Sequence, residues 1–373
     1  MTRGVLYTGD VFRMQSQGGI TRFFLEVGTR LARPVTVAAG LHVSPRVPAF
    51  GARAKPAWRI PSDRVFRRAA APVNAWVDAQ AFSSHRGAIL HPTYYRDPAG
   101  LPRRAPIVLT VHDMAHERFP DLLPPRRRWW TATDPAIHKR ALCERADLVH
   151  CNSRATRDDL VEILGVPAAK TRVVHLAGTD WSSIPATPIA GLDRPFVLWV
   201  GERRGYKNFA LTATALAACR SAGGLGVLCV GGGPLRADEQ RHLASLGLAA
   251  RIVQRDVGDR ELRWAYERAA ALLYTARWEG FGIPMLEALS LGCPVLAADV
   301  PALREVGGDA VSYADPGHVD SLADGIGRVI ESGRDPGSSA RAAHAARFSW
   351  DACAKGMESI YAELDESVGA AAP

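Results

Sequence analysis

The sequence lacks the features of a membrane-spanning, secreted or metal-cluster protein. No apolar run approaches the roughly 20 residues that span a bilayer, and the first residues carry no apolar segment of a secretory signal, so we expect a cytoplasmic protein. The cysteines show no C-x-x-C spacing, which predicts buried thiols instead of a zinc site or disulfide framework. They are Cys143, Cys151, Cys219, Cys229, Cys293 and Cys353.

Carboxylate pairs of the Asp-x-Asp type are also absent, which fits a mechanism that uses protein cations instead of a metal. Neither zinc-finger spacing nor a stacking-aromatic RNA motif occurs, so we expect no nucleic-acid partner. The net charge of +8 and the pI near 9.4 do favour acidic partners, among them a nucleotide diphosphate or an anionic lipid surface. Charge alone does not choose among these.

What is present is the composition of a soluble globular chain that is long enough for two domains, with 47% hydrophobic residues over 373 positions. Short apolar runs alternate with helical stretches, which predicts an α/β protein with parallel sheets. The runs lie at 5–7, 35–38, 89–90, 107–111 and 148–151, and then at 196–200, 225–230, 251–253, 271–274 and 294–297. Between the two series lies a segment rich in Pro and Gly, 183–193, which predicts an interdomain linker.

The segment from Glu279 to Glu287 is the most informative in the chain. Gly280 and Gly282 permit close approach of the backbone, and Pro284 suits the first turn of a helix. Amide groups at a helix start attract phosphate. Glu279 precedes this helix and Glu287 lies about one turn inside it, so both carboxylates could face one ligand, one at a sugar ring and the other at a ribose diol. The segment therefore predicts a sugar-nucleotide site.

This segment resembles the glutamate-rich motif of retaining GT-B glycosyltransferases of family 4 (group 1), in particular mannosyl-type transferases of cell-envelope polysaccharides. Further motifs of that family occur earlier in the chain, in the order that the family shows, at 18–23, 110–113, 146–153, 201–208 and 231–234. The resemblance therefore spans nearly the whole chain. It implies two Rossmann-like domains that face each other across a cleft. We expect an acceptor domain at 1–185, a donor domain at 186–349, a terminal helix at 350–366 that packs back on the first domain, and a tail at 367–373.

The resemblance also implies which residues act. Catalytic roles fall on His112, Glu279, Arg203 and Lys207, and donor binding falls on Gly19, Arg203, Lys207, Val253, Gly280, Phe281, Gly282, Ile283 and Glu287. The two cations would balance the charge of the departing diphosphate, so that no metal or other cofactor is expected. Glu202 stands where many members have arginine, so either Arg203 or Arg204 would supply that role. By contrast, Asp113 and Ser153 are typical of helix caps.

His112, at the end of an apolar strand, would orient the sugar or stabilise positive charge instead of acting as a general base. The family's retention is attributed to front-face attack, in which the leaving diphosphate takes the acceptor proton. The resemblance thus implies transfer of a mannosyl or deoxyhexosyl unit from a GDP-linked sugar to a saccharide or lipid-linked acceptor, in polysaccharide or lipopolysaccharide assembly.

Three other functions are open to the same chain: a sugar-nucleotide epimerase, a catalytically silent nucleotide- or carbohydrate-binding module of this fold, and a nucleic-acid binder. Epimerases of this fold use a different set of acids and lack this glutamate motif, and neither the silent module nor the nucleic-acid binder explains the whole motif series. Basic and aromatic residues occur together at 126–130 and 64–68, the latter with Phe66. They suit either peripheral contact with an anionic membrane on the inner face of the plasma membrane or a solvated basic surface.

Overall fold

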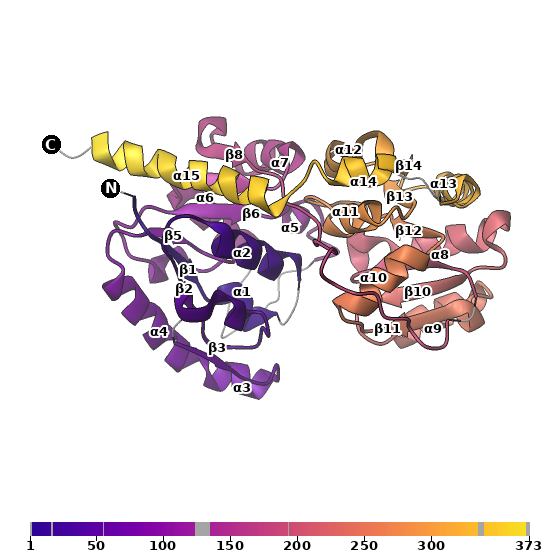
Figure 1. Ribbon diagram of the computed structural model, residues 1–373, viewed down its shortest axis with the longest axis horizontal. Coiled ribbons are helices and arrows are strands. Elements are labelled where there is room, and N and C mark those ends of the chain that lie inside the picture. The colour runs from indigo at the N-terminus through magenta and orange to yellow at the C-terminus, as the bar shows by residue number, and fades with distance from the viewer. Residues whose placement is uncertain are drawn as a thin grey trace. The chain divides into compact units, whose positions relative to one another are not determined.

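The computed structural model describes residues 2–15, 18–54, 56–123, 135–192, 194–334 and 339–370, and it divides into two compact units (Figure 1). Unit 1 comprises Met1–Leu176 and Trp350–Pro373, and unit 2 comprises Ala177–Ser349. The first boundary between the units lies between residues 176 and 177, whereas we predicted it between residues 185 and 186. The segment 183–193 therefore belongs to unit 2. The second division lies where we placed the start of the terminal helix.

Unit 1 is built on parallel strands, as the alternating pattern predicted. One sheet has the order β2-β1-β5 and a second the order β6-β7-β8, and a parallel bridge between Leu90 and Ile107 joins them. The strands are β1 (Val5–Thr8), β2 (Val35–Ala38), β5 (Ile89–His91), β6 (Val108–Val111), β7 (Leu148–Cys151) and β8 (Thr171–Val173). A separate parallel pair consists of β3 (Gly40–His42) and β4 (Ala57–Arg59).

Helices surround these strands in unit 1. They are α1 (Asp10–Met14), α2 (Gly19–Arg30), α3 (Arg64–Ala69), α4 (Ala71–Ser84), α5 (Ala115–Arg118), α6 (Pro135–Arg145), α7 (Arg154–Leu164) and α15 (Trp350–Ala370). Local sequence explains the ends of α7: the Ser153 hydroxyl accepts a hydrogen bond from the Thr156 amide, and Gly165 ends the helix in the left-handed region with φ 69°. Ser153 is thus the helix cap that we predicted. The Asp113 carboxylate accepts a hydrogen bond from the Ala115 amide at the start of α5, but the N-cap residue of that helix is Met114.

Unit 2 contains one six-stranded parallel sheet with the order β11-β10-β9-β12-β13-β14. Its strands are β9 (Phe196–Val200), β10 (Gly226–Val230), β11 (Ile252–Arg255), β12 (Ala271–Tyr274), β13 (Val295–Ala298) and β14 (Ser312–Ala314). The helices are α8 (Phe209–Ala218), α9 (Ala237–Ser245), α10 (Asp259–Arg268), α11 (Ile283–Ser290), α12 (Pro301–Gly307), α13 (Val319–Ser332) and α14 (Ser339–Ala345). The apolar strands and the apolar faces of α8 and α13 form its core.

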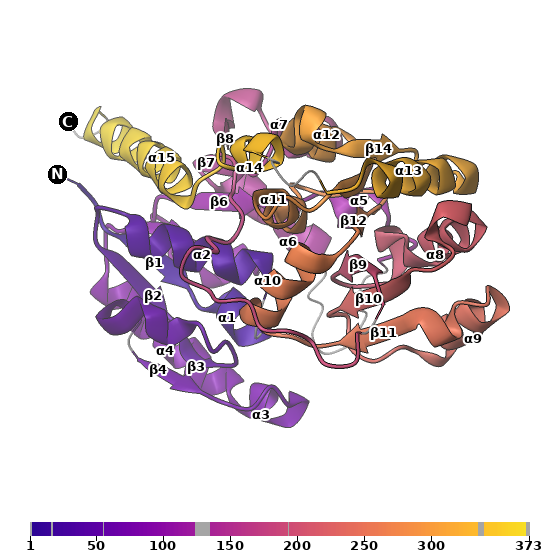
Figure 2. The same cartoon turned by 45° about the vertical axis from the view of Figure 1, so that its right-hand side comes forward.

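The last helix, α15, returns to unit 1 and lies along α2, as Figures 1 and 2 both show. The buried Arg33 guanidinium, just after α2, is paired with Glu358 at 2.7 Å and with Asp365 at 3.2 Å. We predicted that this helix ends at residue 366, and that bound was wrong, because the helix continues to Ala370.

All six cysteines are buried free thiols, which confirms that prediction. Among the described residues, no helix combines the length and the apolar character that crossing a membrane requires.

Candidate active site

Two of the charged residues to which we assigned catalytic roles, Lys207 and Glu279, are in direct contact. Lys207 Nζ lies 2.6 Å from Glu279 Oε1, and the lysine side chain is 24% exposed and the glutamate 11% exposed. Lys207 follows β9, and Glu279 follows β12, the neighbouring strand, so both lie at the carboxyl edge of the unit 2 sheet. This is the edge at which open α/β sheets bind ligands.

Aromatic side chains hold this ion pair from two sides. The Tyr206 ring lies under Lys207 Nζ at 5.0 Å from its centroid. Burial and the Glu279 carboxylate, with which its hydroxyl is hydrogen-bonded, raise the pKa of Tyr274 well above its ordinary value. Burial acts to lower the pKa of Lys207, but the Glu279 carboxylate outweighs it and raises that pKa, so the ammonium group stays charged at neutral pH. Lys207 thus keeps its positive charge within the ion pair with Glu279.

The glycine-proline start of α11 is formed as predicted. Gly282 precedes the helix with φ 104°, a conformation that favours glycine, and a Cβ there would lie 2.8 Å from the Leu303 side chain. Pro284 occupies the first turn. Phe281 is 3% exposed and meets the Phe348 ring at 6.0 Å. Gly280, Gly282 and Ile283 therefore lie on a backbone segment that packing holds in place beside Glu279.

Glu287 is more enclosed than the sequence implied, with 3% of its surface exposed. Its Oε2 accepts a hydrogen bond from the Tyr266 hydroxyl at 3.0 Å, and its Oε1 accepts one from the Thr179 hydroxyl. The chain passes close by at Gly178, where a Cβ would lie 3.3 Å from the Glu287 amide nitrogen. Binding of a ribose diol by Glu287 stays a prediction, and the diol would have to share the carboxylate with these two hydroxyl groups.

Arg203 requires a correction, because its guanidinium is 0% exposed and does not face open space. It donates hydrogen bonds to the carbonyl oxygens of residues 231–234, at 2.7 Å to Gly231 and 2.6 Å to Gly233, and it is paired with Glu239 at 3.3 Å. The glycine turn after β10 presents these carbonyl groups inward, and the arginine satisfies them. Arg203 therefore supports the turn, while the neighbouring Arg204 is exposed.

Sequence reasoning missed the residues that orient the predicted ones. Tyr206, Tyr274, Tyr266 and Thr179 contact Lys207, Glu279 or Glu287, but as isolated hydroxyl-bearing residues they carry no motif. Asn208 did offer a clue. It adopts φ 69°, which asparagine tolerates, and its Nδ2 donates to Thr275 O at 3.2 Å and to Pro316 O at 2.7 Å, so it holds the Lys207 loop against β12.

In unit 1, His112 follows β6 and is 8% exposed. Its main chain is tied by two bonds: its amide donates to the Tyr95 hydroxyl at 3.2 Å, and its carbonyl accepts from Asn152 Nδ2 at 2.8 Å. Burial lowers the pKa of His112 to about 3, so its ring is neutral at pH 7. Gly19 begins α2, the helix whose Phe23 ring packs on His112 at 5.9 Å. Gly19 thus lies about one turn before the residue of α2 that contacts His112.

Two further predictions concern Val253 and the two basic-aromatic segments. Val253 lies on β11, opposite Leu228 of β10, and it is partly buried. The basic-aromatic segment 126–130 lies outside the described residues, whereas the segment 64–68 forms α3, with Phe66 53% exposed.

Both halves of the chain match models of known protein families. Residues 17–177 match the model described as Glycosyltransferase Family 4, and residues 185–347 match Glycosyl transferases group 1. Among curated relatives, O-antigen chain mannosyltransferase B of Escherichia coli is 27% identical over 74% of both chains. D-inositol 3-phosphate glycosyltransferase of Mycolicibacterium smegmatis is 30% identical, and the match covers 66% of this chain and 59% of the relative.

Solved structures show the same fold at low identity. Sucrose-phosphate synthase from Thermosynechococcus elongatus aligns with a TM-score of 0.70 at 19% identity, covering 98% of this chain and 100% of that one. Anabaena HepE in complex with UDP-glucose also gives 0.70, at 18% identity and with 98% and 100% coverage. These neighbours are GT-B glycosyltransferases with two domains, which confirms the fold class that the motifs predicted.

Proposed function

The chain belongs to the glycosyltransferases of group 1 and family 4, and from this premise we propose that it moves a mannosyl or deoxyhexosyl unit from a GDP-linked sugar to a saccharide or lipid-linked acceptor, with retention of configuration. We place this transfer in polysaccharide or lipopolysaccharide assembly. Support for the sugar comes from relatives that are named mannosyltransferases, including O-antigen chain mannosyltransferase RfbU of Salmonella typhimurium, which is 39% identical over 61 residues.

The observation that carries the proposal is the ion pair between Lys207 and Glu279 beside the glycine-proline start of α11. An ammonium group has three donors, so Lys207 can keep its bond to Glu279 and still donate to a diphosphate oxygen. The pair also fixes Lys207 before the donor binds, so little reorganisation is needed when negative charge develops on the leaving group. In this scheme the backbone of residues 280–283 receives the phosphates, and Glu279 contacts the sugar.

The remaining roles follow from burial and charge. In the proposal no metal is needed, because Lys207 balances the charge of the departing diphosphate, with Arg204 as the exposed cation of the same loop. Arg203 is not assigned to the diphosphate. A neutral His112 can donate or accept one hydrogen bond to the sugar, but with a pKa of about 3 it is a poor proton acceptor at neutral pH. This fits front-face attack, in which the leaving diphosphate takes the proton from the acceptor.

Thermal unfolding with GDP, UDP, dTDP and ADP, each with and without EDTA, tests the donor. A ligand at 100 times its Kd adds about 2.7 kcal/mol to stability, which corresponds to a rise of several degrees in Tm for a chain of this size. We expect GDP to stabilise the protein and EDTA to leave the shift unchanged. Release of GDP from GDP-mannose should then require an added saccharide acceptor, and NMR of the product would report whether configuration is retained.

Other outcomes of this series would change the proposal at defined points. A shift with UDP alone would overturn the GDP assignment, and loss of the shift in EDTA would overturn the metal-free scheme. Binding of every nucleotide without turnover of any nucleotide sugar would favour a catalytically silent module.

We further propose that unit 1 contacts an anionic membrane through an exposed basic and apolar surface. Large apolar side chains are exposed on β4, α3 and α4: Trp58 at 52%, Val65 at 72%, Phe66 at 53%, Val73 at 39% and Trp76 at 58%. Arg59, Arg67 and Arg68 are exposed beside them in the sequence. Such a combination favours the interface of an anionic bilayer, which would bring the enzyme to a lipid-linked acceptor.

Flotation with vesicles tests this surface. We expect the wild-type protein to float with phosphatidylglycerol vesicles at low salt and not with phosphatidylcholine vesicles, and we expect Trp58→Ala with Phe66→Ala to weaken flotation at least tenfold. Trp264→Ala, on the helix α10 of unit 2, is the control aromatic change. Equal flotation of both variants and the wild type would count against the surface.

A further inference from the structure

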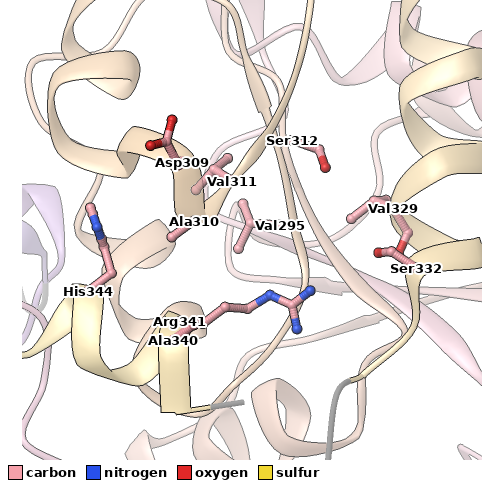
Figure 3. Close-up of a pocket in the computed structure, with 10 residues that line it drawn as sticks. All are labelled: Val295, Asp309, Ala310, Val311, Ser312, Val329, Ser332, Ala340, Arg341 and His344. Carbon is pink, nitrogen blue, oxygen red and sulfur yellow. The ribbon is translucent and has the colours of Figure 1, made fainter.

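Unit 2 contains a hollow that the proposed transfer does not use. Its volume is about 480 Å³, and it is lined by residues of β13, β14, α13, α14 and the turn before β14 (Figure 3). Val295 and Ser312 are the first residues of their strands, so the hollow lies at the amino-terminal edge of the sheet. Lys207 and Glu279 lie at the carboxyl-terminal edge. The hollow is therefore separate from the candidate donor site.

Arg341 extends from α14 into this hollow, and Figure 3 shows its guanidinium directed toward the space between Ser312 and Ser332. Its Nη1 atom is buried and has no hydrogen-bond partner among the described residues. A buried donor of a charged group is costly to leave unpaired. Asp309 also lines the hollow, but its carboxylate is directed away from Arg341 in the same view, and no ion pair joins the two in the described part of the chain.

The surroundings of Arg341 add positive charge. Arg334, two residues after α13, donates to the main-chain oxygens of Tyr266, Ala269 and Leu291, and in the part of the chain that the structure describes it has no carboxylate partner. Burial raises the pKa of the Cys293 thiol to about 11, and the positive charges of Arg334 and Arg341 both oppose that rise, so the two guanidinium groups act on the same small region. An anion would be attracted to it.

The rest of the lining defines what kind of anion would fit. Hydroxyl groups of Ser312 and Ser332 can donate to an oxyanion, although Ser332 now donates to Val329 O at 2.9 Å. Val295, Val311 and Val329 form an apolar wall. The hollow, at about 480 Å³, is many times larger than the roughly 30 Å³ that one water molecule occupies in the liquid, so it has room for more than a bare phosphate ion. We infer that this hollow binds a small organic phosphate or carboxylate, with the oxyanion on Arg341 and the apolar body against the valines.

Binding at this position would also act on the donor site, and this part rests on the proposed function. Helix α14 packs on α11, the helix that contains Glu287. The ring of His344, on α14, meets the Phe348 ring at 5.9 Å, and Phe348 meets Phe281 at 6.0 Å. An anion that holds α14 in place would therefore support the segment 280–283, and we expect it to tighten nucleotide binding.

Thermal unfolding in inorganic phosphate, at constant ionic strength set with NaCl, tests the site. We expect saturating phosphate to raise the Tm of the wild-type protein by about 3 °C, and Arg341→Gln to remove this shift. Arg347→Gln, an exposed arginine in the same part of the chain, should keep it. Lys207→Ala should keep it as well, because that change affects the donor site and not the hollow. Phenyl phosphate and benzoate would distinguish phosphate from carboxylate as the preferred group.

Several results would overturn the inference. An equal shift in Arg341→Gln would place phosphate elsewhere, and loss of the shift in Lys207→Ala would assign it to the donor site. Asp335 lies outside the described residues and is the carboxylate closest before Arg341 in the sequence. If Asp335→Asn and Arg341→Gln destabilise the protein equally and phosphate has no effect on the wild type, the counterion of Arg341 is the Asp335 carboxylate. The inference of an anion site would then be wrong. Nucleotide affinity that is unchanged by phosphate would refute the coupling to α11, while a failed transfer assay alone would leave the phosphate result unaffected.

Discussion

At the scale of single residues, Lys207 is the group on which the proposed chemistry depends most directly. Replacement by alanine removes the ammonium group that lies 2.6 Å from Glu279. We expect Lys207→Ala to lower kcat by about 10²- to 10³-fold, as for loss of one donor that stabilises developing charge. Lys355→Ala, an exposed lysine of α15, is the matched control. Turnover within threefold of the wild type in Lys207→Ala would remove this residue from the site.

Arg203 and Arg204 are adjacent in the sequence but differ in environment. Arg203→Ala leaves the carbonyl groups of residues 231–234 and the buried Glu239 carboxylate without this donor, and we expect a loss of about 3 kcal/mol in the free energy of unfolding. Arg204→Ala should change stability by less than about 0.5 kcal/mol, since it is exposed. Urea unfolding measures both. A normally stable Arg203→Ala protein with turnover lowered a hundredfold would return Arg203 to the diphosphate.

Glu287 is the residue whose role requires a kinetic separation. If it holds the ribose, Glu287→Gln should raise the donor KM about tenfold with little change in kcat, which corresponds to one charged hydrogen bond. Tyr266→Phe is the control, because it removes a partner of the carboxylate and leaves the charge in place. A donor KM that is equal to the wild-type value in Glu287→Gln would indicate that Glu287 supports α11 through Thr179 and Tyr266 only.

At the scale of elements, the docking of α15 on unit 1 depends on ion pairs of very different burial. The Arg33 side chain is 1% exposed where it meets Glu358 and Asp365, whereas the pair of Arg30 with Asp351 has side-chain exposures of 35% and 89%. We expect Arg33→Met to lower the free energy of unfolding by about 3 kcal/mol and Arg30→Met by less than about 0.5 kcal/mol. Urea unfolding at pH 7 tests this. Equal losses would show that apolar packing, not the buried pairs, holds the helix.

At the scale of the whole molecule, buried histidines make stability depend on pH. The His91 ring is hydrogen-bonded to the Tyr361 hydroxyl at 2.7 Å and to the Thr110 hydroxyl at 2.8 Å. The Thr110 hydroxyl is also hydrogen-bonded to the His150 ring at 3.1 Å. This network of side chains joins β5, β6, β7 and α15. Burial lowers the pKa of His91 well below its ordinary value and that of His150 to about 4. Both rings are neutral in the folded protein at pH 7.

The sign of the effect follows from where protons bind. Between pH 6.5 and about 4 the unfolded chain protonates His150 and the folded protein does not, so the free energy of unfolding falls as pH falls through this window. At pH 5 the loss is about 2 kcal/mol for this histidine. His150→Gln should reduce the acid sensitivity of urea unfolding, whereas the exposed His318→Gln should not. An unchanged slope between pH 6.5 and 4.5 in His150→Gln would contradict this account.

Local chemistry was enough to predict much of this molecule. The apolar runs lie within a residue or two of the observed strands, because a strand buried on both faces needs a continuous apolar segment. Ser153 identified the start of α7 through the hydroxyl that caps an amide group. Gly282 and Pro284 marked the start of α11, because only certain backbone angles suit that turn. Each of these inferences needs only residues that are close in the sequence.

The sequence by itself therefore determined the fold class and the position of the glutamate segment, and only the tertiary structure decided which side chains are available there. Arg203 and Arg204 are the same residue type at adjacent positions, but the Arg203 side chain is buried and Arg204 is exposed. The partners of Glu287 come from residues 108 positions before it and 21 positions before it in the sequence. The physical reason is that hydrogen bonding and exclusion of water depend on distances in space, and packing between elements that are far apart in the chain sets those distances.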